Sequence, residues 1–220
     1  MSGSDEIIQL KIRLLGISPM IWRRVLVPVS IGVRELHGII QVAMGWEGIH
    51  LYEFDIRAVR YGSLELFAAN PDLPLSGFAF RQNEAFSYVY DMGDHWAHEI
   101  RIETFADVDT KKKYPSCTGG SGACPPEDCG GVEGYLHRRE EADGYDAWQD
   151  MHSMLDLLSE ATKPDAGKEV VREFLTDDVQ TTMERVLARE PYSTAKFSRG
   201  DVNRAFRAGR HLELMRQQMW

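Results

Sequence analysis

The chain has 220 residues, of which 43% are hydrophobic and 10% aromatic, so it can bury a substantial core and is not mainly disordered. A formal net charge of −9 disfavours binding of nucleic acid over the whole surface, because an acidic body repels phosphate backbones. No stretch approaches the ~20 consecutive apolar residues that a membrane-spanning helix needs, so we expect no membrane association.

The first residues, 1–6, have neither the basic region nor the apolar run of a secretory signal. Three cysteines are an odd number, which argues against a disulfide framework. We therefore expect a cytoplasmic protein. Its length fits a single domain over 1–220, with a sheet-and-helix core at 5–135 and a helical C-terminal extension at 136–220.

The chain opens with two predicted strands and a helix. Apolar and polar residues alternate along 7–14, and a second apolar run covers 21–27, which together predict a hairpin. Over 33–44 the apolar residues recur with the period of a helix. Ser30 is expected to cap this helix and Gly45 to end it.

Strand patterns return at 51–59, 86–90 and 96–102, and the last two form a hairpin around the turn at 91–94. A helix laid across a sheet is the simplest packing for this order of elements. We predict an α+β fold. It has a mixed β-sheet with the helix packed across it, in a β-grasp-like ββαβ core, and C-terminal helices follow.

The C-terminal part is predicted to be helical. Helical patterns cover 145–158, 167–175 and 178–187, and a last helix begins near Ser198, where the spacing to Asp201 fits a capping box.

This end of the chain is basic although the whole chain is acidic. Residues 191–220 contain six basic and two acidic residues, a net charge of +4, so the rest of the chain carries −13. Arg204, Arg207 and His211 are expected along one helix face, which suits an acidic protein partner, a second copy of the chain or nucleic acid. A solvated helix face explains the same charges without any partner. The acidic body favours a protein partner over DNA.

Residues 114–134 are predicted to form a loop that contains all three cysteines, and loops of this length are uncommon unless functional or tied down. Three thiolates and one histidine would make a closed, structural zinc site. Small buried hydrophobic side chains are the alternative role for the cysteines. The candidate ligands are Cys117, Cys124 and Cys129 with His98 as the fourth, or in its place His50, His95 or His137.

The turn of the second hairpin gathers two carboxylates, Asp91 and Asp94, and two imidazoles, His95 and His98. Such groups bind divalent ions or transfer protons. A tight turn requires the same residues at 91–94, and this interpretation is favoured. A small metal-dependent enzyme that combines the cysteine loop with Asp94 and His98 is the corresponding alternative function.

Two pairs of neighbouring charged residues are further candidates for a functional site. Glu127 and Asp128 precede a predicted helix, so we expect them to cap it rather than to support a metal. Arg23 and Arg24 lie beside Trp22 and face opposite sides of a strand. They would bind phosphate or stack on a base, although pairing with the acidic loop is favoured.

Five sequence blocks carry a family resemblance. They are Pro19–Pro28, Glu35–Trp46, His50–Phe54, Tyr90–Ile100 and Cys117–Gly131. In this order they resemble the plasmid pRiA4b ORF-3-like protein family over about 7–135. Its members occur on plasmids and as passengers of insertion elements, so the resemblance implies a non-enzymatic accessory or interaction protein. A nucleic-acid-binding accessory protein that uses the basic C-terminal helix is the alternative.

Overall fold

The structure, a computed structural model, describes residues 6–163, 176–193 and 196–217. The chain divides into two compact units. The sheet unit comprises Met1–Val132 and Lys196–Trp220, and the helical unit comprises Glu133–Ala195. Residues 196–220, which were expected to belong to a helical extension over 136–220, therefore fall in the sheet unit. The single-domain organisation stays a prediction.

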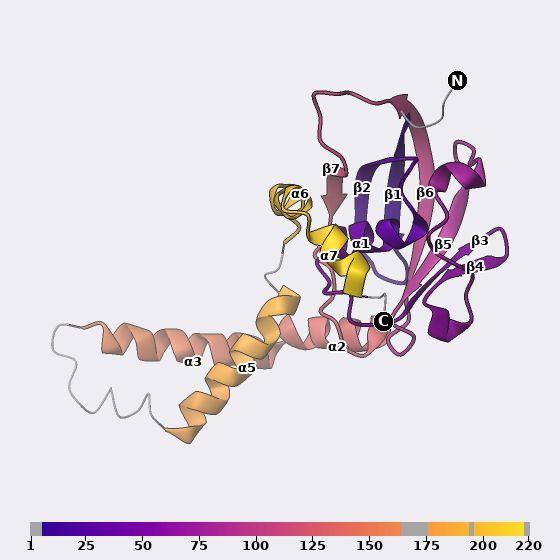
Figure 1. Cartoon of the computed structure of the whole chain (residues 1–220). Helices are drawn as coiled ribbons and strands as arrows, with labels where there is room; N and C mark the ends of the chain where they lie inside the picture. Colours follow the sequence, from indigo (N-terminus) through magenta and orange to yellow (C-terminus); the bar gives the residue numbers. More distant parts are fainter. Residues whose placement is uncertain (1–5, 164–175, 194–195, 218–220) are drawn as a thin grey trace. The chain divides into compact units, whose positions relative to one another are not determined.

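The sheet unit is built on one seven-stranded sheet, whose strands follow the order β4-β3-β5-β6-β1-β2-β7 (Figure 1). Burial alternates along most strands, so one face carries the core and the other faces solvent. The strands are β1 (Glu6–Leu14), β2 (Trp22–Pro28), β3 (Tyr52–Ile56), β4 (Val59–Gly62), β5 (Ala85–Tyr90), β6 (Trp96–Asp107) and β7 (Ser116–Ser121).

The predicted α+β class and the helix packed across the sheet are confirmed, but the expected mixed sheet is wrong. Every pairing between the strands named above is antiparallel. In a β-grasp core the strand after the helix would lie beside β1. Here β6 takes that place: it has twelve residues and pairs along the whole length of β1. The strand after the helix, β3, instead pairs with β4 and β5.

Helix α1 (Val33–Met44) has the predicted bounds and covers the apolar face of the sheet. The ring of His37 stacks on Tyr52 of β3 with centroids 3.8 Å apart, and Gln41 donates a hydrogen bond to the Tyr88 hydroxyl of β5. The helix ends at Gly45 in the left-handed region, as predicted. It begins after Gly32, so the expected cap at Ser30 is wrong.

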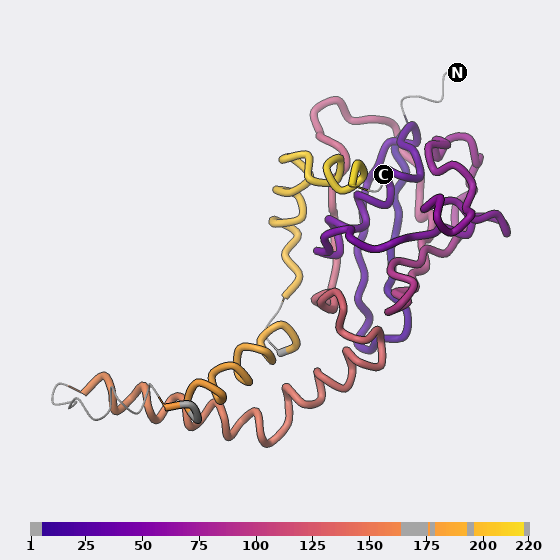
Figure 2. Tube along the Cα trace, turned by 60° about the horizontal axis from the view of Figure 1, so that its bottom comes forward, coloured from indigo at the N-terminus to yellow at the C-terminus, as the bar shows by residue number. Residues whose placement is uncertain are grey.

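Two short helices pack near α1. Ser198 caps α6 (Arg199–Arg207) by accepting a hydrogen bond from the N–H of Asp201, as predicted. The chain then turns at Gly209, with a φ of 81°, and continues as α7 (Arg210–Gln217). Helix α7 lies against α1, which is why most of α1 is buried; both helices can be followed in Figure 2.

The segment between β4 and β5 contains two 3₁₀ helices, η1 (Leu64–Leu66) and η2 (Leu75–Phe78), which the sequence patterns did not predict. The predicted loop at 114–134 is wrong in part, because β7 lies inside it and pairs with β2 at the sheet edge. Glycine and serine make β7 a weak strand pattern, so only the neighbouring strand identifies it.

The helical unit contains most of α2 (Gly131–Ala142), then α3 (Tyr145–Ala161) and α5 (Asp177–Ser193). The helices predicted at 145–158 and 178–187 are confirmed. The helix predicted at 167–175 lies outside the described residues. Arg185 of α5 forms a bidentate ion pair with Asp150 of α3. Within the described parts of the chain, no helix has the length and apolar character to cross a membrane.

Candidate metal centre

Three side chains from distant parts of the sheet unit meet at one point. His50 precedes β3, Asp91 follows β5, and Asp128 precedes α2. The Nε2 atom of His50 lies 3.0 Å from Asp128 Oδ1 and 3.6 Å from Asp91 Oδ2. One ligand atom from each residue lies within 4.8 Å of the other two. We call these three residues the His50 centre.

Asp91 is the buried member of the His50 centre, with only 7% of its surface exposed. Its Oδ1 atom accepts hydrogen bonds from the N–H groups of Gly93 and Asp94, at 2.8 and 3.3 Å. The Oδ1 atom therefore stabilises the turn, as the favoured interpretation predicts. The other oxygen atom, Oδ2, points toward His50. Asp91 also has a φ of 59°, which costs free energy in a residue other than glycine. One carboxylate thus shapes the turn and faces the centre.

The segment that carries Asp128 is fastened to the sheet by hydrogen bonds on both sides of it. The indole Nε1 of Trp46 donates to the carbonyl of Pro125 at 2.9 Å, and the N–H of Gly130 donates to Asp94 Oδ2 at 3.1 Å. A Cβ atom at Gly131 would lie 2.5 Å from the carbonyl oxygen of Asp94, so this close approach requires glycine. These contacts fix the backbone around Asp128.

Glu127 supports the same segment from the sheet side. It accepts hydrogen bonds from the hydroxyl of Tyr90 and from the N–H of Glu47. Burial, and then the bond to Glu127, raise the pKa of Tyr90, so this phenol stays protonated and donates. The expected capping role of Glu127 and Asp128 is wrong, because these side chains make other contacts. Glu127 bonds to Tyr90 and Glu47, and Asp128 pairs with His50.

One imidazole nitrogen and two carboxylates form a donor set that divalent transition metals accept. The side chains of His50 and Asp128 are 26% and 64% exposed, so the centre has a solvent-facing side opposite the buried Asp91. The sequence pointed to His50, Asp91 and Asp128 separately and in other roles. Their convergence depends on strand order, which no local pattern reveals.

The four residues predicted as a zinc site are not brought together. Across the described ranges, the His50 centre is the single group of three or more histidine, cysteine or acidic ligand atoms within 4.8 Å. Cys117 is buried on β7, where its N–H donates to Asn203 and its thiol to the Gly119 carbonyl. His98 is buried on β6 between Trp46 and Tyr88. Zinc binding by these residues stays a prediction without geometric support.

Burial disfavours the reactive thiolate at two of the three cysteines. Burial raises the pKa of Cys117 and of Cys124, which keeps both protonated near neutral pH. Cys129 is buried as well. Of the alternative histidine ligands, His95 is exposed on the turn, and His137 pairs with Glu141 within the helical unit.

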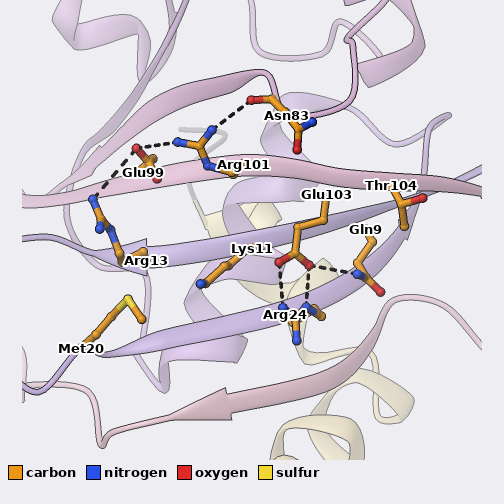
Figure 3. A pocket seen from close by; sticks show the side chains of 10 residues that line it. All are labelled: Gln9, Lys11, Arg13, Met20, Arg24, Asn83, Glu99, Arg101, Glu103 and Thr104. Carbon is orange, nitrogen blue, oxygen red and sulfur yellow. Dashed lines mark hydrogen bonds and ion pairs between the residues drawn. The ribbon is translucent and has the colours of Figure 1, made fainter.

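The two arginines of β2 face opposite sides of the sheet, as predicted. Arg23 is buried and donates from Nε to the carbonyl of Ala43 at 2.7 Å, and its guanidinium lies 4.2 Å from the Phe197 ring centroid. Burial lowers its pKa. Arg24 lies on the open face and forms a bidentate ion pair with Glu103 of β6 (Figure 3). The expected pairing with the acidic loop is therefore wrong for Arg24.

The expected basic stripe on the C-terminal helix is divided by the turn at Gly209. Arg204 and Arg207 are exposed on α6, and Arg204 pairs with Asp201 at 2.9 Å. His211 belongs to α7, where it is buried against the ring of Phe206. Binding by Arg204 and Arg207 stays a prediction, but His211 does not share their surface.

Comparisons with known proteins agree with the sequence blocks. A family model described as plasmid pRiA4b ORF-3-like protein matches residues 6–168. The chain is 40% identical over 138 residues to uncharacterized protein y4hQ of Sinorhizobium fredii (strain NBRC 101917 / NGR234), covering 59% of this chain and 70% of that protein.

A solved structure is also similar. It is the crystal structure of MM3350, a protein of unknown function from Methanosarcina mazei Go1, with 31% sequence identity and a TM-score of 0.61. The match covers 70% of this chain and 90% of that chain. Sequence blocks, family model and fold agree, and the chain belongs to the plasmid pRiA4b ORF-3-like protein family.

Proposed function

We propose that this protein binds a divalent metal ion through His50, Asp91 and Asp128, and that this centre is its functional site. The observation that carries the proposal is the convergence of three separate segments on one point. Each segment comes from a different one of the sequence blocks that mark the family. A buried carboxylate supports it further, because a charge such as that of Asp91 is costly to bury without a partner of opposite charge.

Three protein ligands leave coordination positions open on most divalent ions. In the His50 centre those positions would lie on the solvent-facing side, where a water molecule or an anionic group could bind. A bound ion supplies a Lewis acid at that place. The chain's own residues hold the ligands: the turn at 91–94 orients Asp91, and Trp46 and Tyr90 fasten the segment of Asp128. We therefore describe the protein as a metal-binding accessory protein.

Calorimetric titration of chelator-treated protein with Mn²⁺, Co²⁺ and Zn²⁺ tests this proposal. We expect saturable binding of one ion per chain, and visible absorption of the Co²⁺ form reports its coordination. His50→Gln and Asp128→Asn should each weaken binding by about tenfold or more, the size of losses seen when coordination is disturbed. Asp107→Asn removes an exposed carboxylate at the end of β6 and is the matched control.

If none of the three ions binds saturably, or if Asp128→Asn and Asp107→Asn bind alike, the His50 centre is only a cluster of charges. A surface ion pair of this kind contributes little to stability and needs no metal.

A second candidate function, self-association, rests on the surface of α3. Its residues Trp148, Met151, Leu155 and Leu158 are between 48% and 61% exposed. Their spacing of three and four residues is that of a helix-pairing seam, and a seam of this kind can pair with its own copy. We propose a second copy of the chain as the partner.

Light scattering over a range of protein concentrations tests self-association. We expect a dimer that Leu155→Ser shifts toward the monomer, while Ser153→Ala, which is exposed on the opposite side of the same helix, leaves the mass unchanged. A monomer at every concentration would exclude it.

A further inference from the structure

The open face of the sheet, opposite α1, contains a pocket of about 620 Å³ (Figure 3). Side chains from β1, β2 and β6 line it, and six of them are charged. The cations are Lys11, Arg13, Arg24 and Arg101, and the anions are Glu99 and Glu103. The charged lining therefore has a net charge of +2, whereas the whole chain carries −9.

The strand register places three cations in one row. Lys11 of β1 is paired across the sheet with Arg24 of β2 on one side and with Arg101 of β6 on the other. Like charges directly opposite each other destabilise a sheet. The ion pairs of Arg24 with Glu103 and of Arg101 with Glu99 offset part of this repulsion, and a bound anion would offset the rest.

The two glutamates restrain the arginines without neutralising the pocket. Glu103 holds Arg24 in a bidentate pair. Glu99 lies 3.2 Å from Arg101 and 4.0 Å from Arg13. Two carboxylates thus serve three guanidinium groups, and Figure 3 shows both sets of contacts.

Lys11 is held in a different way. Its Nζ lies 5.4 Å from the ring centroid of Trp22, and the guanidinium carbon of Arg24 lies 5.2 Å from the same ring. In the described part of the chain, no carboxylate oxygen lies within 4.0 Å of Lys11 Nζ, although Glu103 is near enough to interact with it electrostatically. An aromatic ring positions a cation without cancelling its charge. The ammonium group in the middle of the row is therefore available to a ligand.

We infer that this pocket binds a phosphate monoester of nucleotide size. A phosphate group carries about two negative charges at neutral pH, which matches the net charge of the lining. Guanidinium and ammonium groups are the usual phosphate ligands. The volume of the pocket lies within the range of small-molecule sites, about 300–1,000 Å³. A nucleic-acid polymer fits less well, because it would extend beyond the pocket over an acidic protein.

The test is calorimetric titration with adenosine monophosphate and with inorganic phosphate, at low salt and with chelator present. The chelator removes any ion from the His50 centre, so failure of this proposal and failure of the metal proposal are distinguishable. We expect saturable binding of adenosine monophosphate. Lys11→Gln should weaken it by about tenfold, as expected for loss of one charge-assisted contact. Lys112→Gln, an exposed lysine outside the pocket, is the control.

A variant with the opposite effect sharpens the test. Glu99→Gln removes a negative charge and releases Arg101 and Arg13, so binding should become severalfold tighter. A purely structural role for Glu99 would weaken binding or leave it unchanged. The inference is overturned if adenosine monophosphate does not bind saturably, or if Lys11→Gln and Lys112→Gln bind alike. It is also overturned if single-stranded oligonucleotides bind while the monophosphate does not.

Discussion

The imidazole of His50 lies 3.0 Å from the carboxylate of Asp128, although the two residues are far apart in the sequence. This contact joins the segment before β3 to the segment before α2, and Asp91 closes the group from the turn after β5. A metal ion at this point would cross-link three segments of the sheet unit. Metal binding should therefore be visible in the stability of the protein.

We predict that a divalent ion at 100 times its dissociation constant raises the free energy of unfolding by about 2.7 kcal/mol, because only the folded chain assembles the centre. Thermal unfolding with and without the ion measures this. In Asp91→Asn the amide oxygen keeps the hydrogen bonds of the turn but the charge is lost, so at the same ion concentration the increase should fall to about 1.4 kcal/mol or less. An increase of equal size in that variant would show that the ion binds elsewhere.

Stability should fall in mild acid because of two histidines. Both His37 and His98 are fully buried, and burial lowers the pKa of His37 to about 3 and that of His98 to about 4. In the unfolded chain a histidine pKa is about 6.5. The unfolded state therefore binds protons that the folded state does not, and the free energy of unfolding decreases as the pH falls below about 6.5. From about pH 7 to about pH 5 each histidine should remove about 2 kcal/mol.

Urea unfolding at both pH values measures that loss. His37→Gln should reduce it by about half, since one of the two buried imidazoles is gone. His137→Gln removes an exposed imidazole of the helical unit and should leave the loss unchanged. Equal stability at the two pH values would mean that neither histidine is buried in its neutral form.

Gly38 allows α1 and α7 to approach closely. A Cβ atom at this position would lie 2.2 Å from the carbonyl oxygen of His211, a backbone atom that cannot move aside alone. Gly38→Ala should therefore destabilise the protein by about 1–3 kcal/mol, in spite of the higher helix propensity of alanine. Gly200→Ala places a Cβ no closer than 3.8 Å to the Ser198 hydroxyl and should be neutral or stabilising. Unfolding curves of the two variants compare them.

The thiols should react slowly in the folded protein. Burial keeps Cys117 and Cys124 protonated, and the thiolate is the reactive form. We expect a chromogenic disulfide reagent to modify the native protein at least about tenfold more slowly than a Ser159→Cys variant, whose added thiol lies on the exposed surface of α3. Rapid modification of a native thiol would return the cysteines to consideration as functional groups.

Local patterns predicted much of the fold. The helix at 33–44 has the bounds that its apolar period indicates, and Gly45 ends it because glycine adopts the left-handed conformation without strain. The N-cap at Ser198 formed as predicted, since its hydrogen bond joins residues three positions apart. The family blocks were also recognisable from the sequence alone, and the family model confirms them.

The tertiary structure decided what the local patterns left open. Three features depend on partners distant in the sequence: the place of β6 beside β1, the antiparallel pairing of the sheet, and the strand at 116–121. The same holds for the His50 centre and for the row formed by Lys11, Arg24 and Arg101, because strand order and register place these side chains together. Periodicity reports which face of an element is buried but not which element covers it. The amino-acid sequence by itself therefore determined most of the elements and the family, and only long-range pairing decided which charged groups meet.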